Sequence, residues 1–339
     1  MLTIRPYTLH FRTPWRYSGG TLDRRDGLLV VRATPWGDIY SDCAPLPGFS
    51  AEALDDCRRV FRALGVLDLS FLDDPDAFDD VAAAAPWPAA VRAALECLHL
   101  GSLCAQGNPH PLWGYPPLPS VPVQAVTNSP DEARTLASLG FRTLKIKLGM
   151  QPIADELDRL RAIRNAVGND VVLRGDANGA WDLETAQRML RGLAGLGLEL
   201  VEEPVRDPTP DRLAGLRGVA PILIAADESA RDEASVAALV AAGAVDAVVL
   251  KPMLTGGPLT TLRIARAVDQ AGLLPIISSS LESNVGLRCA FEVARRLPAA
   301  TAHGLATAHL FHANVGDELP VRDGHMTIAS GAHDDGGFA

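Results

Sequence analysis

The chain lacks the features that mark exported or membrane-inserted proteins. Its 339 residues include five cysteines, an odd number that forms no CxxC pair, so a small disulfide framework is excluded. No stretch approaches the roughly 18 apolar residues of a membrane span, and no apolar signal segment lies between Arg5 and Arg12. No Asn-x-Ser/Thr acceptor occurs. We therefore expect a cytoplasmic protein with reduced thiols.

Positive charge is also scarce. The chain has 31 Lys and Arg residues against 41 Asp and Glu residues, a formal net charge of −10. A field of this sign repels phosphate backbones and anionic lipids, so neither nucleic acid nor a membrane surface is an expected partner. No GxSxG elbow is present and no cysteine accompanies a suitably placed histidine, so hydrolase chemistry has no support.

Residues before about 120 show a mixed pattern, with strand-like and helical segments followed by a proline-rich connector. The strand-like segments are 2–11 and 27–33, the helical ones are 51–64 and 88–105, and the connector is 109–122. We predict an α+β capping domain at 1–115, a barrel at 116–310, and a C-terminal segment at 311–339. That segment returns to the cap and ends in a frayed tail.

After residue 120 the chain repeats. Short apolar strands alternate with helical patterns, and from the second strand onward their starts lie roughly 24 to 28 residues apart. The predicted strands are 121–127, 143–149, 171–178, 198–204, 222–229, 247–252, 274–280 and 301–307. Eight strands alternating with helices predict a parallel sheet closed into a (β/α) barrel, and a doubly wound open sheet is the alternative.

Acidic residues stand at the ends of three successive strands, where such a barrel places its chemistry. Asp176, Glu202 and Asp227 fall one per repeat, so neighbouring strands should bring the three carboxylates together. Converging carboxylates repel one another unless a cation binds, and an all-oxygen ligand set suits Mg²⁺. The pattern therefore predicts a magnesium site.

Three lysines occupy matching positions. Lys145 and Lys147 are two residues apart on the second strand and point to the same side, whereas Lys251 ends the sixth strand. Four strands apart in an eight-stranded barrel means opposite sides of the site. A like-charge pair disfavours protonation, so we expect the pKa of one of the paired lysines to be lowered toward the range of a general base.

Neighbouring polar residues are expected to support this centre. Glu203 and Glu228, each beside a predicted ligand, should hydrogen-bond the lysines or orient the ligands. Arg174 should point inward and pair with a carboxylate. Gly256-Gly257-Pro258 is better explained as a tight turn than as a phosphate loop, because it lacks the longer glycine pattern and its lysine.

The order KxK, DxN, ExP, DES and then a strand-ending Lys resembles the enolase superfamily, in its muconate-lactonising subgroup, over nearly the whole chain. Within that subgroup the similarity is strongest to members that form 2-succinylbenzoate. It rests on IISSSLESNVGL (276–287), APLPGFS (44–50) and RGDANGAW (174–181). The resemblance implies a TIM-like (β/α)₇β barrel with an N-terminal α+β capping domain.

The resemblance also implies roles. Asp176, Glu202 and Asp227 would hold Mg²⁺, for which Mn²⁺ could substitute. Lys147 would remove a proton α to a carboxylate, Lys251 would stabilise the resulting enediolate, and Lys145 would tune the base. The implied substrate contacts are Asn178, Arg174, Ser278 and the backbone at Gly304, with Arg16, Arg24 or Arg25 of the cap as further candidates.

The implied reaction is the syn dehydration of a small-molecule carboxylate, 2-succinyl-6-hydroxy-2,4-cyclohexadiene-1-carboxylate, to 2-succinylbenzoate in menaquinone biosynthesis. A racemase of N-succinylamino acids or a dipeptide epimerase could use the same residues. A non-catalytic binding barrel is disfavoured, because all five positions of the Lys-Asp-Glu-Asp-Lys order are filled, by Lys147, Asp176, Glu202, Asp227 and Lys251. The sequence indicates no oligomeric state.

Overall fold

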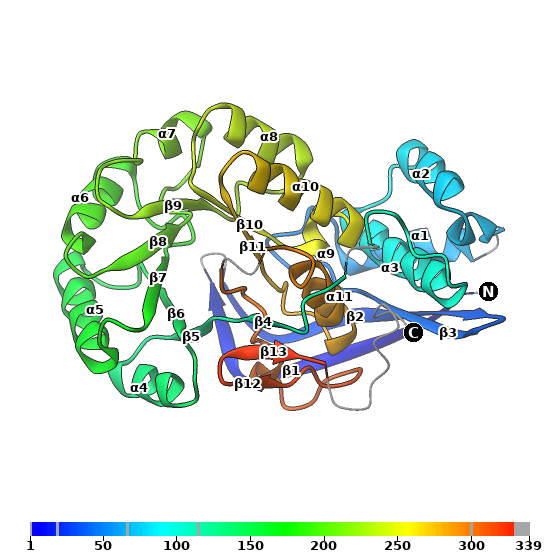
Figure 1. Ribbon diagram of the computed structural model, residues 1–339, viewed down its shortest axis with the longest axis horizontal. Helices are drawn as coiled ribbons and strands as arrows, with labels where there is room; N and C mark the ends of the chain where they lie inside the picture. Colours follow the sequence, from blue (N-terminus) through cyan, green and yellow to red (C-terminus); the bar gives the residue numbers. More distant parts are fainter. Residues whose placement is uncertain (1, 18–19, 66–67, 114–115, 299–300, 329–339) are drawn as a thin grey trace.

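The computed structural model describes residues 2–17, 20–65, 68–113, 116–298 and 301–328. An N-terminal sheet and its helices lie beside a ring of strands wrapped by helices (Figure 1). No helix within these ranges combines the length and apolar character needed to cross a membrane. The predicted frayed tail, residues 329–339, lies outside the described residues.

The cap begins with an antiparallel meander and continues with helices. Its strands are β1 (Leu2–Tyr17), β2 (Gly20–Thr34) and β3 (Gly37–Cys43), and its helices are α1 (Leu54–Leu64), η1 (Ser70–Asp73), α2 (Pro75–Ala84) and α3 (Ala89–Ala105). The β1–β2 register shifts between His10 and Trp15, after which Trp15 faces Leu22. Helix α3 is buried along most of its length, because it packs on β3 and against the barrel.

Seven parallel strands form the barrel sheet in sequence order. They are β5 (Ala125–Thr127), β6 (Thr143–Lys147), β7 (Val172–Asp176), β8 (Leu198–Glu202), β9 (Leu223–Ala226), β10 (Ala247–Leu250) and β11 (Leu274–Ile277). The helices that follow them are α4 (Pro130–Ser138), α5 (Ile153–Val167), α6 (Leu183–Leu193), α7 (Pro210–Ala214), α8 (Glu233–Ala241), α9 (Pro252–Thr255), α10 (Pro258–Gln270) and α11 (Asn284–Ala294). The predicted barrel is confirmed, and the open-sheet alternative is wrong.

The eighth position is occupied by a short bridging segment instead of the predicted strand at 301–307. His303 bridges Val123, and Gly304 bridges Ser278, both in parallel. The His303 N–H donates to the Pro122 carbonyl at 2.9 Å, and the Gly304 N–H donates to the Ile277 carbonyl at 2.8 Å. Backbone hydrogen bonds to both neighbours therefore close the ring, although too few residues pair to make a regular strand.

Two other segments differ from the expected pattern. The predicted strand at 121–127 is divided into β4 (Ser120–Pro122) and β5, and β4 pairs with β13 (His325–Thr327), which in turn pairs with β12 (Val321–Arg322). After η2 (Ala308–Leu310), Phe311 bridges Phe11 of the cap, and their rings lie 4.6 Å apart. The C-terminal segment thus contacts both domains.

Helix starts follow the sequence signals. The side chains of Ser129, Asp182, Thr209 and Asp232 each accept a hydrogen bond from a backbone N–H in the first turn of the following helix. Proline occupies the first turn after Ser129 and Thr209, where its missing N–H costs nothing. These caps place each helix start just after a strand, at the rim that holds the site.

The barrel contains a separate apolar cluster. It consists of Leu200, Ala225, Ala247, Val249 and Ile276, all of them buried. A larger core runs without interruption from the cap through the layer between strands and helices. In barrels of this kind the ligand binds at the carboxyl ends of the strands.

Candidate active site

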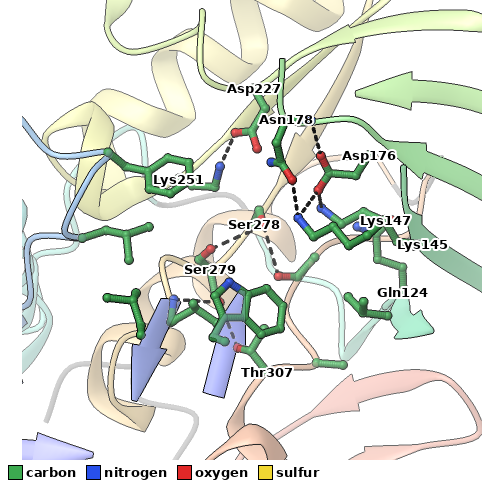
Figure 2. Close-up of a pocket in the computed structure, with 18 residues that line it drawn as sticks. Gln124, Lys145, Lys147, Asp176, Asn178, Asp227, Lys251, Ser278, Ser279 and Thr307 are labelled. Carbon is green, nitrogen blue, oxygen red and sulfur yellow. Dashed lines mark hydrogen bonds and ion pairs between the residues drawn. The ribbon is translucent and has the colours of Figure 1, made fainter. Parts of the chain in front are cut away.

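A cavity opens at the carboxyl ends of the barrel strands, between barrel and cap (Figure 2). The barrel contributes most of the polar lining, and the cap contributes an apolar wall. The lining residues are Trp15, Leu22, Leu46, Phe49, Gln124, Val126, Lys145, Lys147, Asp176, Asn178, Asp227, Lys251, Ser278, Ser279, Leu281, Gly304, Ala306 and Thr307.

Five of the six predicted carboxylates and lysines line this cavity, and the sixth, Glu202, is fully buried and pairs with Lys145. Strand register sets Lys147 beside Asp176 and Asp176 beside Glu202, with Asp227 just after β9. Lys145 Nζ lies 2.9 Å from Asp176 Oδ2 and 2.9 Å from Glu202 Oε2. Lys147 Nζ lies 2.7 Å from the same Asp176 oxygen, and Lys251 pairs with Asp227. The charges thus compensate one another within one buried cluster.

The three carboxylates fit a divalent cation by their chemistry. Across the described ranges, no three histidine, cysteine, aspartate or glutamate side chains stand in a metal-holding arrangement. Lysines pair with all three carboxylates, Lys145 with Asp176 and Glu202 and Lys251 with Asp227. Glu202 Oε1 is buried without a hydrogen-bond partner, which leaves one ligand oxygen available. The oxygen atoms of three carboxylate side chains are ligands of the kind that Mg²⁺ prefers.

Burial and charge set the protonation of this cluster. Burial raises the pKa of Asp176, but Lys145 and Lys147 outweigh it and hold that pKa well below its usual range. Burial lowers the pKa of Lys145, but Asp176 and Glu202 outweigh it and raise that pKa. The lowered pKa expected from the lysine pair is therefore wrong for Lys145, since its nearest charges are carboxylates and not Lys147.

The lysines face each other across the cavity, as their strand positions predict. In Figure 2, Lys145 and Lys147 lie on one side and Lys251 lies on the other, with Ser278 below the space between them. Lys147 Nζ lies 5.8 Å from the centroid of the Trp15 ring, and Lys251 Nζ lies 5.6 Å from that of Phe49. A planar substrate held between them would present one face to each ammonium or amine.

The two supporting glutamates position their neighbours. Glu203 Oε2 accepts the backbone N–H of Asp227 at 2.7 Å and that of Ser229 at 3.1 Å, which orients the Asp227 strand end. Glu228 Oε1 accepts from Asn178 Nδ2 at 2.8 Å. Burial raises the pKa of Glu203 to about 7 and that of Glu228 to about 8.

Asn178 lies between a lysine and a glutamate. Its Oδ1 accepts from Lys147 Nζ at 2.7 Å while its Nδ2 donates to Glu228, and its φ of 44° is left-handed. Asparagine tolerates that conformation better than most residues do. The described contacts of Asn178 therefore hold Lys147, a role beyond the substrate contact expected from the resemblance.

Two expected substrate contacts are corrected. Arg174 is 1% exposed and is absent from the cavity lining, because it points into the barrel interior and pairs with Glu199 at 2.6 Å. Arg25 is also 1% exposed and donates to the carbonyls of Leu281, Pro45 and Ala44. Arg24 is exposed and pairs with Asp26. Nothing is described of the Arg16 side chain.

Ser278 and Gly304, in contrast, do line the cavity. The Ser278 hydroxyl donates to the Gly304 carbonyl at 3.3 Å, and Ser279 Oγ lies 2.8 Å from Thr307 Oγ1. The turn predicted at Gly256-Gly257 is present, and the carboxylate of Glu96 occupies the start of α10 that follows it.

Several lining residues were missed by sequence reasoning. Trp15, Leu22, Leu46 and Phe49 come from the cap, where the strand-end rule does not apply. Leu281 projects from the loop after β11 with a φ of 59°. Its position in the SSSLES string was the available signal. Gln124 precedes β5 by one residue, and nothing in the local pattern marks it.

Comparison with known proteins shows similarity to enzymes of the enolase superfamily. A family model described as enolase C-terminal domain-like matches residues 129–332. An o-succinylbenzoate synthase of Thermobifida fusca (strain YX) is 39% identical over 328 residues, covering 94% of this chain and 86% of the relative. A hydrophobic dipeptide epimerase of Enterococcus faecalis (strain ATCC 700802 / V583) is 34% identical over 307 residues, covering 86% and 85%.

A solved structure shares the fold. The dipeptide epimerase from Cytophaga hutchinsonii, complexed with Mg and the dipeptide D-Ala-L-Val, superposes with a TM-score of 0.84 at 23% identity, covering 96% of this chain and 92% of that one. The chain therefore belongs to the enolase superfamily, in its muconate-lactonising subgroup. Three relatives at 32–39% identity are o-succinylbenzoate synthases, which confirms the resemblance within that subgroup.

Proposed function

We propose that this chain is an o-succinylbenzoate synthase. It dehydrates 2-succinyl-6-hydroxy-2,4-cyclohexadiene-1-carboxylate to 2-succinylbenzoate, a step of menaquinone biosynthesis. The observation that carries the proposal is a cavity whose charged residues all belong to the lysine and carboxylate centre, in a chain 39% identical to an enzyme of that name.

Asp176, Glu202 and Asp227 hold a divalent cation, Mg²⁺ or Mn²⁺, in this proposal. The relative complexed with Mg and a dipeptide supports the choice of metal. When bound, the cation stabilises the negative charge that develops on the substrate carboxylate. Glu203 fixes the Asp227 strand end through its backbone N–H, and Glu228 holds Asn178 in place.

Lys147 is the proposed base. It removes the proton from the ring carbon that bears the carboxylate, and the electron pair left there enters the ring π system. The C–O bond to the ring hydroxyl then breaks, and Lys147 returns its proton so that the hydroxyl departs from the same face as water. The products are water and the aromatic acid. Lys251 keeps a positive charge on the opposite face and stabilises the anion between the two steps.

The uncharged remainder of the cavity argues against a dipeptide substrate. A dipeptide carries an ammonium group that needs a buried carboxylate partner. The acidic side chains among the described lining residues are Asp176 and Asp227, both assigned to the metal. The residues Gly304 and Ala306, at the eighth barrel position, also line the cavity. Neither has a polar side chain that could bind an ammonium group.

The second candidate is an N-succinylamino acid racemase. The opposed lysines favour it, because Lys147 and Lys251 could exchange a proton on either face of one anion. An N-succinylamino acid also carries no ammonium group, so the cavity does not disfavour it.

One set of assays separates these candidates. Purified protein with Mg²⁺ should convert the cyclohexadiene substrate with the appearance of an aromatic absorbance. N-Succinylamino acids in D₂O should exchange their α-proton slowly or not at all. Racemisation with a far higher kcat/KM than dehydration would replace the proposed function with the second candidate.

A further inference from the structure

The backbone of Lys147 lies where the barrel sheet loses one of its neighbouring strands. On one side Lys147 is paired with Asp176 of β7. On the other side the pairing of β5 with β6 ends at Thr127 and Ile146, one residue before Lys147. The N–H and carbonyl groups that a longer β5 would bind therefore need other partners.

Two side chains supply these partners. The Lys147 N–H donates to Asn128 Oδ1 at 3.1 Å, and the Lys147 carbonyl accepts from Arg159 Nη2 at 2.7 Å. Arg159 Nη1 also donates to Asn128 Oδ1, at 3.3 Å. Asn128 is the first residue after β5, and Arg159 belongs to α5, which lies on the outside of the ring of strands (Figure 1). A side chain from the outer helix thus holds the strand end that carries the proposed base.

Glu156 extends this hold by two residues and fixes the guanidinium. It lies one turn before Arg159 on α5, and its side chain is 1% exposed. Its Oε1 accepts from Arg159 Nη2 at 3.1 Å, and its Oε2 accepts from the Gly149 N–H at 2.8 Å. A planar guanidinium with a buried carboxylate partner has few other orientations open to it. We call Asn128, Glu156 and Arg159 the β6 clamp.

The β6 clamp lies outside the catalytic cavity. None of its three residues, all of them described, lines that cavity. Asn128 and Arg159 line an adjoining groove that also reaches Lys147. Inside the cavity, Lys147 Nζ contacts Asp176 and Asn178. The route from Arg159 to a substrate in the cavity therefore runs through the backbone of Lys147.

We infer that Arg159 is a positioning residue for the proton transfer. By holding the Lys147 carbonyl it sets where the lysine side chain begins, and so where Nζ stands relative to the substrate carbon. The inference rests on the proposed function for the role of Lys147 as the base. A base acts only within hydrogen-bond reach of the proton, and a misplacement of about 1 Å can cost about 100-fold in rate.

The kinetics of Arg159→Met measure this role. Methionine keeps an apolar stem but has no donor, so kcat for the cyclohexadiene substrate should fall by roughly 10- to 100-fold, while KM changes less than about twofold. With deuterium on the ring carbon that bears the carboxylate, the isotope effect on kcat should increase, because proton removal becomes the slow step. Arg159→Lys keeps a charged donor without the planar fork and should recover part of the rate.

Two further variants accompany these. Arg161→Met is the matched control, because Arg161 lies on the same helix, is 53% exposed and pairs with exposed Asp158. Its kcat, KM and isotope effect should equal those of wild type. Asn128→Ala removes the acceptor of the Lys147 N–H from an exposed position. It should lower kcat in the same way as Arg159→Met, by a smaller factor.

Two kinetic results would overturn the inference. A higher KM at unchanged kcat in Arg159→Met would make Arg159 a substrate-binding residue. A lower kcat with an unchanged isotope effect would show that Arg159 has no part in the proton transfer. If Arg159→Met does not fold, the same two criteria apply to Arg159→Lys.

Hydrogen exchange provides a readout that needs no substrate. The Lys147 and Gly149 amides, followed by NMR, should exchange roughly 10-fold faster in Arg159→Met than in Arg161→Met, because the clamp has lost its central donor. Equal exchange in the two variants would also overturn the inference. Failure of the wild-type protein to dehydrate the diene overturns the proposed function instead, and the exchange comparison still decides whether Arg159 holds the Lys147 backbone.

Discussion

At the residue scale, the two lysines on opposite sides of the cavity, Lys147 and Lys251, have different contacts. Lys147 Nζ contacts Asp176 and Asn178, whereas Lys251 pairs with Asp227. Both side chains are largely buried, with 16% and 11% of their surface exposed. Their positions on β6 and after β10 followed from the repeat, because strand order determines angular position in a closed barrel.

Replacing each lysine in turn should show which one acts as the base and which one stabilises the anion. Lys147→Ala removes the proton acceptor, so turnover should fall by roughly 10²- to 10⁴-fold, and exchange of the α-proton with D₂O should vanish. Lys251→Ala should reduce turnover by weakening stabilisation of the anion. Steady-state rates and NMR-detected exchange measure both effects. Near-normal exchange in Lys147→Ala would place the base elsewhere.

The carboxylates should prove essential through the metal. Asp176→Asn, Glu202→Gln and Asp227→Asn each remove one ligand charge, and we expect activity to fall to background in all three. EDTA should abolish wild-type activity, and added Mg²⁺ or Mn²⁺ should restore it. Metal content by mass spectrometry provides a readout independent of turnover. Full activity in a metal-free preparation would contradict the assignment.

At the scale of elements, the loop between β11 and α11 joins the barrel to the cap. Asp42 of β3 accepts from the Tyr7 hydroxyl and from the Ser283 N–H and hydroxyl. Arg25 of β2 donates to the Leu281 carbonyl. This buried network holds the left-handed Leu281 against the cavity, so cap residues shape a wall that the loop sequence alone does not define.

Glu282 in this loop should make stability depend on pH. Burial raises its pKa to about 7, above the usual value of 4.5, so the folded state holds a proton that the unfolded state releases between those values. The stability contribution of Glu282 is complete below about pH 4.5 and is lost as the pH rises through about 7. Ionised Glu282 should cost on the order of 3 kcal/mol.

The test compares urea unfolding at pH 5 and pH 8. Glu282→Gln can still accept the Ser280 N–H but cannot ionise, so it should gain stability relative to wild type at pH 8. Exposed Glu318→Gln is the control for removal of a charge. An identical pH dependence in wild type and Glu282→Gln would refute this role.

At the scale of the whole molecule, one glutamate of the cap holds a barrel helix. Glu96 of α3 is 1% exposed and accepts the N–H groups of Leu259 and Thr260 at 2.8 and 3.2 Å, together with the Thr260 hydroxyl. These donors belong to the first turn of α10, where a carboxylate is favoured. The interface between the domains is therefore polar at this point and apolar around it.

Removing this contact should weaken the molecule as a unit. Glu96→Ala leaves buried N–H groups without an acceptor and should cost roughly 2–4 kcal/mol in the free energy of unfolding. Urea denaturation should show a lower midpoint. Glu233→Ala removes a half-exposed partner of Arg263 and should cost less than about 1 kcal/mol. Equal effects of the two changes would exclude a special role for Glu96.

The sequence alone determined the barrel, its repeat and the six charged strand-end positions of the candidate site. Side chains on a strand alternate with a period of two residues, and the strand-helix unit repeats about every 25 residues. Both periods can be read from the hydrophobic pattern along the chain. The assignment of Asp176, Glu202 and Asp227 to one site needed only the rule that parallel strands end at the same rim.

Only the tertiary structure decided which residues face the cavity from outside the repeat. Trp15 and Phe49 reach it from the cap, Arg174 proved to contact Gln124 and Ala302 instead of the cavity, and the eighth strand shortened to two bridges. The pKa of Lys145 likewise depends on carboxylates of β7 and β8, not on its sequence neighbour. Contacts between residues far apart in the chain arise from packing, and no local pattern encodes them.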